Sequence, residues 1–334
     1  MKKAINYSFV LLFSAYTAGA QDFHLSQYDM ATQYLNPAMT GMYGGETGDY
    51  RIYSDYRSQW QNASLNPYTT AYLAYDMSAV KWNKDLGLGA YFVNSSSGIS
   101  SLNSFNLMLS AAYNITGNSQ DIHELTTGIQ MGIIHKGFDP DNFTYDSQYS
   151  EALGGFDTGL PSGENYSRSS ITGFDANYGI YYKYIEKGKL ANPFGGFSIY
   201  HLTRPNESFT STESKMPMRF NLHGGCDLSV DESLKLTPRF LYMSQAKSNE
   251  FNLGLLTSYA IANSPYSALL QLDYRNGDAF IMGLGIKQNQ HIFRITYDMN
   301  SSSLNNYANS SSSWEVSLLL TGIKGKSLFG KSSE

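Results

Sequence analysis

After residue 20 the sequence consists of segments of about ten residues in which apolar and polar side chains alternate. In the segment Thr172–Tyr184, Phe174 and Tyr178 fall on one face of an extended strand, and Asp175 and Asn177 fall on the other. Gly, Asn, Ser and Pro separate one such segment from the next. Short alternating segments divided by turn residues are typical of a transmembrane β-barrel.

The same alternation recurs in Met216–Leu228 and in Tyr266–Arg275. An Arg or Lys at the membrane midplane costs about 2 to 4 kcal/mol, so the charged face of each strand is expected to line the lumen. We expect about fourteen strands, an even number as in bacterial barrels. They are predicted to start near Asp49, Tyr68, Leu86, Leu102, Glu124, Thr172, Asn192, Met216, Leu234, Phe251, Tyr266, Ala279, His291 and Trp314. The segments Tyr68–Asp76 and Asn192–His201 alternate poorly.

The amino-acid composition agrees with a barrel whose outer face contacts lipid and whose inner face contacts water. Aromatic residues make up 14% of the chain, with 27 Tyr, and charged residues only 15%, against about a quarter in ordinary globular chains. Beyond residue 20, no apolar run reaches the roughly 18 residues of a transmembrane helix. A membrane protein without such a helix must be a closed barrel, because an open sheet edge cannot be satisfied in hydrocarbon.

The first twenty residues have the features of a Sec signal peptide, with Lys2 and Lys3 before an apolar stretch and Ala18-Gly19-Ala20 at the cleavage site. The mature chain is expected to start at Gln21, where a lipoprotein would need a cysteine. We expect residues 21–48 to form a segment ordered in or against the barrel, although a loose periplasmic terminus is the structural alternative. The barrel is expected over 49–322 and a periplasmic tail over 323–334.

Charge and cysteine content exclude some classes of function. The formal charge of −5 becomes −7 without Lys2 and Lys3, which argues against nucleic acid as a partner. Cys226 is the only cysteine of the chain, so no internal disulfide is possible.

Loop lengths give an independent indication of topology. In an even barrel with both termini in the periplasm, every odd-numbered connection lies outside the cell, where long loops belong. The three longest expected connections are His135–Ile171, Leu202–Lys215 and Asn300–Ser313, which are the fifth, seventh and thirteenth. We therefore expect long extracellular loops and short periplasmic turns such as Val230–Ser233.

Several short motifs occur in a fixed order along the chain. They are residues 21–28 and 34–41, Tyr56-Arg57-Ser58-Gln59-Trp60, residues 198–202 with Pro205, Leu236-Thr237-Pro238, Tyr274-Arg275 and Ile295-Thr296-Tyr297-Asp298. In these motifs the chain resembles the PorP/SprF family of the type IX secretion system of Bacteroidetes. The family usually has Asn at the position of Ser58 and often Ser at that of Arg239. The matching motif residues include Asn36, Pro37, Gly41, Arg57, Trp60, His201, Pro205, Arg275 and Asp298.

The resemblance implies a non-enzymatic outer-membrane barrel of a Gram-negative bacterium. Such a barrel serves the secretion or surface attachment of proteins with a C-terminal sorting domain, among them gliding-motility adhesins. It also implies a periplasmic ring and a peptidoglycan-binding component as partners, besides the lipid bilayer. A small-solute porin and an outer-membrane hydrolase remain as alternative functions.

No motif predicts a catalytic, metal or cofactor site. His123-Glu124 lacks the second histidine of a zinc protease helix, and no serine is singled out as a nucleophile beside His201 or His223, which we interpret as lumen or interface residues. The stretch Asp139–Asp146 has several oxygen ligands suited to Ca²⁺ but lacks the Gly and Glu of an EF-hand loop. It is interpreted as an Asp-rich turn.

The charges predicted to face the lumen have both signs. Mixed signs can pair across a lumen and fill it, whereas a selective pore more often has a ring of one sign, so a packed or plugged lumen is favoured. These residues are Arg51, Asp55, Arg57, Asp175, Lys183, Arg219, Asp227, Asp273, Arg275, Lys287, Arg294, Asp298 and Glu315.

The long loops are the candidate surface for a secreted partner. Tyr supplies contact area at low entropic cost, and small polar residues adapt their hydrogen bonds, as in antibody loops. The candidate cargo contacts are Phe143, Tyr145, Tyr149, Phe156, Tyr166, Phe209 and Tyr307. The structural alternative is that these aromatic residues only pack the loops onto the barrel rim.

Overall fold

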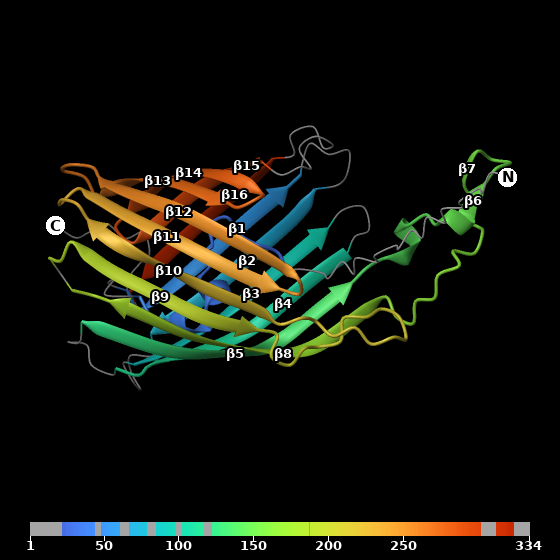
Figure 1. Ribbon diagram of the computed structural model, residues 1–334, viewed down its shortest axis with the longest axis horizontal. Coiled ribbons are helices and arrows are strands. Elements are labelled where there is room, and N and C mark those ends of the chain that lie inside the picture. The colour runs from blue at the N-terminus through green and yellow to red at the C-terminus, as the bar shows by residue number, and fades with distance from the viewer. Residues whose placement is uncertain are drawn as a thin grey trace, which may run out of the picture.

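The computed structural model describes residues 22–43, 48–60, 67–78, 85–97, 102–116, 122–186, 188–301 and 312–323. Fourteen antiparallel strands form one closed barrel, in which β1 pairs with β16 (Figure 1). No helix among these residues is long and apolar enough to cross a membrane. The predicted signal peptide, nearly all of the predicted tail, and Tyr307 lie outside the described residues.

The barrel strands run between short turns and a few long connections. They are β1 (Tyr50–Gln59), β2 (Tyr68–Ser78), β3 (Leu86–Ser97), β4 (Leu102–Asn114), β5 (His123–Gly137), β8 (Ser170–Tyr184), β9 (Ala191–Tyr200), β10 (Arg219–Ser229), β11 (Leu234–Gln245), β12 (Ser248–Ala260), β13 (Tyr266–Arg275), β14 (Ala279–Gln288), β15 (His291–Asn300) and β16 (Ser313–Gly322). A separate hairpin pairs β6 (Tyr149–Ser150) with β7 (Gly155–Phe156). The helices are α1 (Thr32–Leu35) and the 3₁₀ turns η1 (Pro37–Met39), η2 (Pro140–Asn142) and η3 (Asp146–Gln148).

The prediction of a fourteen-stranded antiparallel barrel is confirmed, and each strand starts within three residues of the expected position. One of the larger differences is β10, expected from Met216 but paired only from Arg219. Pro217 has no N–H to donate to a neighbouring strand, and the N–H of Met216 donates instead to the carbonyl of Pro205 at 2.9 Å. The other is β12, which starts at Ser248 rather than Phe251 because it pairs with β11 as far as the turn at Ala246.

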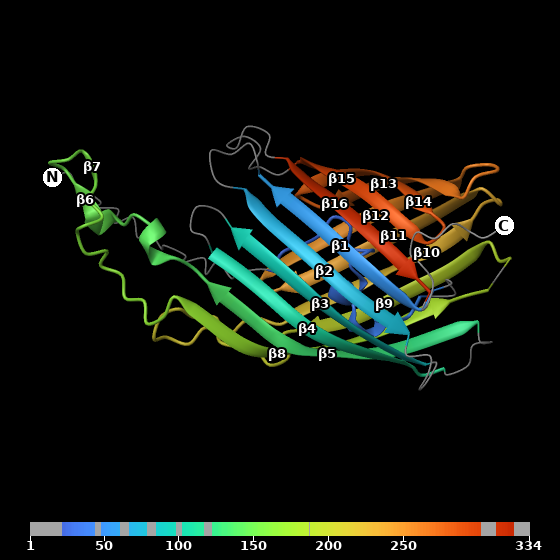
Figure 2. The same cartoon turned by 180° about the vertical axis from the view of Figure 1, so that it is seen from behind.

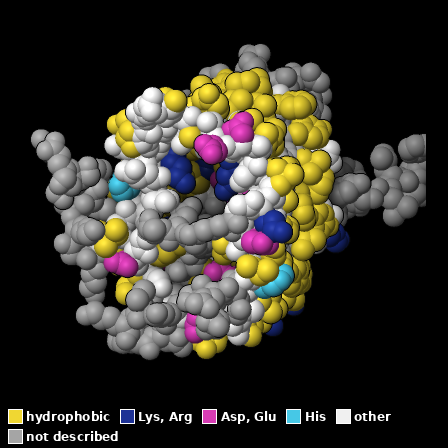
Figure 3. Space-filling model, turned by 90° about the vertical axis from the view of Figure 1, so that its left-hand side faces the viewer, with side chains coloured by type: hydrophobic (Ala, Val, Ile, Leu, Met, Phe, Trp, Pro, Cys, Tyr) yellow, Lys and Arg dark blue, Asp and Glu magenta, His cyan; other side chains and the backbone are white. Residues whose placement is uncertain are grey.

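The two faces of the wall differ in polarity as the alternation predicts. On the outer face, Phe174 is 56% and Leu284 60% exposed, and apolar side chains cover the wall in Figure 3. On the inner face, Asp175 and Glu315 are fully buried. The apolar outer surface fits lipid, since charged groups there would be destabilising.

The two ends of the barrel are unlike. We call the end that carries the connections 138–169 and 201–218 the loop rim, and the end that carries turns such as 230–233 the turn rim. Figure 1 shows the β5–β8 connection reaching far beyond the loop rim, with the β6–β7 hairpin near its tip. β1 starts and β16 ends at the turn rim, so the wall begins and closes on the same side.

Residues Asp22–Tyr43 lie inside the barrel, and we call them the plug. The backbone N–H of Asp22 donates to Gln245 Oε1 at the loop rim, and that of Gly41 donates to Asp76 Oδ2 near the turn rim. The plug therefore runs down the lumen from the loop rim to the turn rim before the chain enters β1. Figure 2 shows its blue ribbon behind the strands of the wall.

Candidate functional site: the plugged lumen and the loop rim

The plug turns at Asn36 and Pro37, where the sequence favours a bend. Pro37 starts η1 with its fixed φ, and the Asn36 side chain caps the turn by accepting from the N–H of Ala38 at 2.9 Å. The Asn36 amide then donates to the carbonyl of Ile180 at 2.9 Å and lies 3.1 Å from Nε2 of His223. The amide also donates to the Phe197 carbonyl at 3.4 Å, so one fully buried side chain fixes the turn and attaches it to β8, β9 and β10.

Inward-facing glycines make room for this turn. A Cβ on Gly128 would lie 2.5 Å from the backbone of Pro37, and one on Gly196 would lie 2.6 Å from the Asn36 amide nitrogen. Gly41 has a φ of +68°, a backbone conformation that glycine adopts without steric cost, and its Cβ position would lie 2.6 Å from Gly87. The plug therefore approaches the wall backbone more closely than a side chain would allow.

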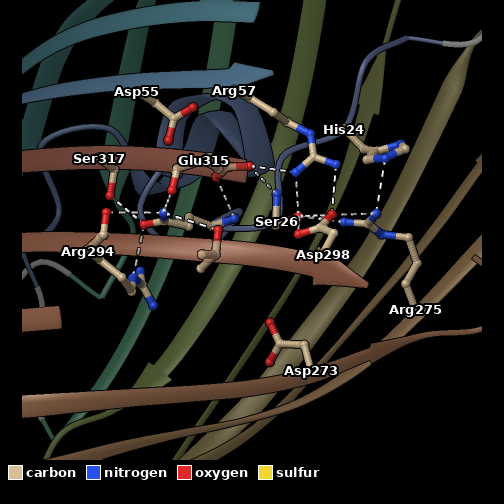
Figure 4. Close-up of polar contacts among 12 residues, drawn as sticks. His24, Ser26, Asp55, Arg57, Asp273, Arg275, Arg294, Asp298, Glu315 and Ser317 are labelled. Atoms are coloured by element: carbon tan, nitrogen blue, oxygen red, sulfur yellow. Dashed lines mark hydrogen bonds and ion pairs between the residues drawn. The ribbon is translucent and has the colours of Figure 1, made fainter. Parts of the chain in front are cut away.

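Ser26 is the centre of a second group of contacts, nearer the loop rim (Figure 4). Its hydroxyl donates to Asp298 Oδ2 at 2.7 Å and accepts from Arg57 at 2.7 Å and from Arg275 at 2.9 Å. The two carboxylate oxygens of Glu315 accept the backbone N–H groups of Ser26 and Gln27 at 2.7 and 2.8 Å. Hydrogen bonds to charged partners are the stronger kind, so this node holds the plug to β1, β13, β15 and β16.

The plug also supplies carboxylates to buried arginines of the wall. Asp29 lies 2.8 Å from both Arg239 and Arg294. Burial alone would raise the pKa of Asp29, but the two guanidinium groups hold it below its usual value. A buried charge that loses its partner destabilises a protein by roughly 3 to 5 kcal/mol, so the wall depends on the plug for charge balance.

At the loop rim, His201 forms a charged pair with the start of the plug. Its Nε2 lies 2.7 Å from Asp22 and its Nδ1 lies 2.8 Å from Asp175. Burial would lower the pKa of His201, but the two carboxylates raise it to about 9. Asp22 also binds Arg219 at 2.8 Å. Both ring nitrogens of His201 are therefore protonated donors, which leaves no lone pair for a general base.

His24 has the opposite protonation state. Arg275 can only donate, and its Nη1 lies 3.1 Å from Nε2 of His24. Burial and the neighbouring charges of Arg275 and Arg57 hold the pKa of His24 well below its usual value. The neutral ring therefore lies 3.4 Å from Glu250, with Nδ1 toward the carboxylate, and does not carry a positive charge there.

Most of the family-motif residues meet at the plug. Asn36, Pro37 and Gly41 belong to it, and Arg57, His201, Arg275 and Asp298 bind it directly. Two do not. Trp60 packs on Tyr68 at the loop rim, with ring centroids 4.7 Å apart. Pro205 packs against Gly173 of β8, where an added Cβ would lie 2.5 Å from the Pro205 side chain.

Sequence reasoning missed several residues that hold the plug. Asp76, which pairs with Arg51, and Arg239 lie among them, as do the inward glycines. The available signal was the poor alternation of β2. There Tyr72 is buried toward the lumen, and the Tyr34 ring of the plug lies 6.3 Å from it. The inner face becomes aromatic where it packs against the apolar side of the plug.

The candidate cargo contacts fall into two groups at the loop rim. Phe143, Tyr166 and Phe209 pack around Phe138, which sequence reasoning did not select; the ring centroids of Phe138 and Phe209 are 4.6 Å apart. Tyr145 joins the group through Phe143 and Tyr166. A hydrogen bond from the Ser167 N–H to the Phe209 carbonyl joins the two long connections, and an ion pair at 2.6 Å joins Lys136, near the end of β5, to Glu207. This group packs the base of the long loop.

Tyr149 and Phe156 form the second group, on the β6–β7 hairpin. Their ring centroids are 5.6 Å apart, and the side chains are 51% and 50% exposed. Leu153 in the same hairpin is 70% exposed. An exposed apolar tip on a fixed base is typical of a protein contact surface. In the Asp139–Asp146 stretch, Asp139 Oδ1 accepts from the N–H of Asp141 and so caps η2.

The comparisons with known proteins agree with this geometry. The family model for the type IX secretion system membrane protein PorP/SprF matches residues 17–320. The chain belongs to the PorP/SprF family. No match was found among curated proteins.

Two solved structures with a similar fold are toluene transporters. The Ralstonia pickettii toluene transporter TbuX is 11% identical over 87% of this chain and 92% of its own, with a TM-score of 0.51. The P. putida toluene transporter TodX is 9% identical over 85% and 91%, with a TM-score of 0.50. At this identity the similarity shows the barrel fold alone. The PorP/SprF family and the barrel together make the chain a membrane component of type IX secretion.

Proposed function

We propose that this PorP/SprF barrel is a non-enzymatic component of the outer membrane that binds secreted cargo through its loop rim. The cargo is a protein with a C-terminal sorting domain, such as a gliding adhesin. The observation that carries the proposal is the exposed tip of the β5–β8 connection, where Tyr149, Leu153 and Phe156 face solvent. Aromatic residues dominate the binding energy of protein interfaces.

The structural difference between the packed base and the exposed tip of the β5–β8 connection supports this proposal. Phe138 and its neighbours already pack the base of the long loop. Because ordering a loop on binding costs free energy, a base that is ordered beforehand avoids that cost when a partner binds. The tip keeps its aromatic pair free of the barrel. The opposite rim carries short turns and faces the periplasm in the topology we expect, where the periplasmic ring and the peptidoglycan-binding component would meet it.

The lumen contacts argue against the two alternatives. A porin needs an open lumen, whereas here Asn36, Ser26 and Gln27 of the plug are fully buried against the wall. A hydrolase using His201 or His223 would need a free ring nitrogen as base. Both nitrogens of His201 bind carboxylates, and Nε2 of His223 faces the Asn36 amide.

Removal of the tip tests the proposal. The Ser147 hydroxyl donates to the carbonyl of Ser162 at 2.5 Å, so the ends of the segment 149–163 lie close together and its deletion leaves a closable loop. We expect normal amounts of heat-modifiable barrel and a loss of cargo from the cell surface. The double variant Tyr149→Ser/Phe156→Ser should give the same loss without a deletion.

A matched control keeps the test specific. Leu190 is 64% exposed at the turn rim, and Leu190→Ser should leave cargo display unchanged. Normal cargo display by a normally abundant deletion variant would reject cargo binding at the loop rim. Conductance in planar bilayers tests the channel alternative separately. The intact protein should not conduct ions, whereas a variant that lacks residues 22–41 should conduct them.

A further inference from the structure

A cavity of 270 Å³ opens at the turn rim, beneath the plug. Its walls are the strand ends on that side, including those that carry Lys183, Asp227 and Lys287. Its floor is made by Tyr28, Leu35 and other plug residues. Figure 3 looks at the turn rim and shows Lys and Arg side chains within its hollow. The volume equals about nine water molecules at roughly 30 Å³ each.

The charge of the lining is positive although the chain as a whole is acidic. The deep arginines Arg239 and Arg294 are balanced by Asp29 and Asp273. Nearer the opening stand lysines from β8, β11 and β14, of which Lys235 pairs with Asp227 at 3.1 Å.

The other two lysines, Lys183 and Lys287, have no carboxylate within 4.0 Å in the part of the chain that the structure describes. The strand partners of Lys183 are Phe194 on β9 and Glu124 on β5. Glu124 interacts electrostatically with Lys183 and offsets part of its charge, while Lys287 adds a further positive charge to the lining. A concave site lined by charge of one sign in low-dielectric walls concentrates ions of the opposite sign.

The rest of the lining is apolar. Phe194 and Phe240 come from β9 and β11, and Leu256 and Leu269 from β12 and β13. Tyr28 of the floor is 6% exposed, and its hydroxyl has no hydrogen-bond partner among the described residues. Small-molecule sites typically combine such an apolar lining with a few polar groups that fix orientation.

We propose that this cavity binds a small amphipathic anion from the periplasmic side. The apolar body of the ligand, such as a short-chain or aromatic carboxylic acid, packs between Phe194 and Phe240. Its carboxylate faces the lysines of the opening. The site is independent of the loop rim, so its occupancy and cargo binding are separable properties of the barrel.

Calorimetric titration of the purified barrel in lipid nanodiscs tests the site, with empty nanodiscs subtracted. The probes are octanoate, the neutral octanamide and the cationic octylammonium. We expect one saturable octanoate site per barrel, octanamide at least tenfold weaker, and no saturable binding of octylammonium. No saturable octanoate site, or octanamide binding as tight as octanoate, would overturn the proposal.

Variants assign the binding to this cavity. Lys183→Met/Lys287→Met should remove the preference for octanoate over octanamide, whereas Lys189→Met, at an exposed turn-rim lysine paired with Glu186, should not. Ser258 of β12 also lines the cavity, so Ser258→Trp should fill it and abolish binding of both probes. Unchanged preference in the double variant, with heat-modifiable folding intact, would contradict the site. Hexadecanoate distinguishes a membrane-derived fatty acid from a small soluble acid, since it exceeds the cavity and should bind no more tightly than octanoate.

Discussion

Asn36→Ala should release the plug without unfolding the barrel. The side chain is fully buried and serves the N–H of Ala38, the carbonyl of Ile180 and the ring of His223. Alanine leaves at least two of these groups without a partner, at a cost of about 1 to 3 kcal/mol each. If the surrounding groups relax in part, the docked state of the plug loses about 2 to 4 kcal/mol in total. This loss increases the fraction of molecules with an undocked plug by between about 30-fold and about 700-fold.

Cysteine labelling measures this fraction. Ala38 is fully buried, so Ala38→Cys in a Cys226→Ala background reacts with a maleimide only when the plug undocks. Adding Asn36→Ala should raise the labelling rate by the factor given above, while heat-modifiable mobility stays that of the parent. Asn276→Ala, in an exposed turn, is the control. A labelling rate within threefold of the parent would refute the assigned role of Asn36.

Four further predictions test other parts of the structure. A tag inserted at 154–155 should be labelled on intact cells, and labelling only after lysis would reverse the topology. Leu222→Arg, on the lipid face, should cost about 2 to 4 kcal/mol of barrel stability by denaturant titration, whereas Leu222→Met should be neutral. Because the pKa of His201 is raised to about 9, its positive charge stabilises the docked start of the plug fully below about pH 6.5, and this stabilisation is lost as the pH rises through about 9. Hydrogen exchange near Asp22, corrected for its intrinsic pH dependence, should therefore accelerate over that range in the parent and not in His201→Gln. Gly128→Val should displace the plug turn and raise labelling at position 38, and an unchanged rate would place the turn elsewhere.

The barrel was predictable because its signals are local. Alternation of period two fixes which side chains face lipid, and turn residues fix where strands end, so β13 and β14 start where the sequence predicts. The exceptions also have local causes, such as the missing N–H of Pro217 before β10. The ends of strands can thus be read from residues that lie a few positions apart.

The path of the plug could not be derived in this way. The contacts of the plug join residues that are far apart in the chain. Ser26 and Asp298, for example, are 272 positions apart. Mixed charge signs in the lumen favoured a packed interior but did not say which arginine meets which carboxylate. The glycines that admit the turn at Pro37 look like ordinary strand glycines in the sequence, since only the docked plug shows why a Cβ is excluded.

The loop aromatics were only partly separable by sequence. Composition selected Phe143 and Tyr149 alike, although the first packs around Phe138 and the second is exposed at the tip. The difference arises from the partner loop, because Phe209 reaches Phe138 from the connection between β9 and β10. No local pattern shows that the two connections meet.

Photo-crosslinking in living cells tests cargo binding at the loop rim most directly. A photoreactive amino acid replaces Phe156 at the tip, and the same substitution at Phe280, which is 53% exposed on the lipid face, serves as the control. We predict an adduct from Phe156 to a secreted protein with a C-terminal sorting domain, and none to that protein from Phe280. Adducts to that protein from neither position, or from Phe280 alone, would contradict it.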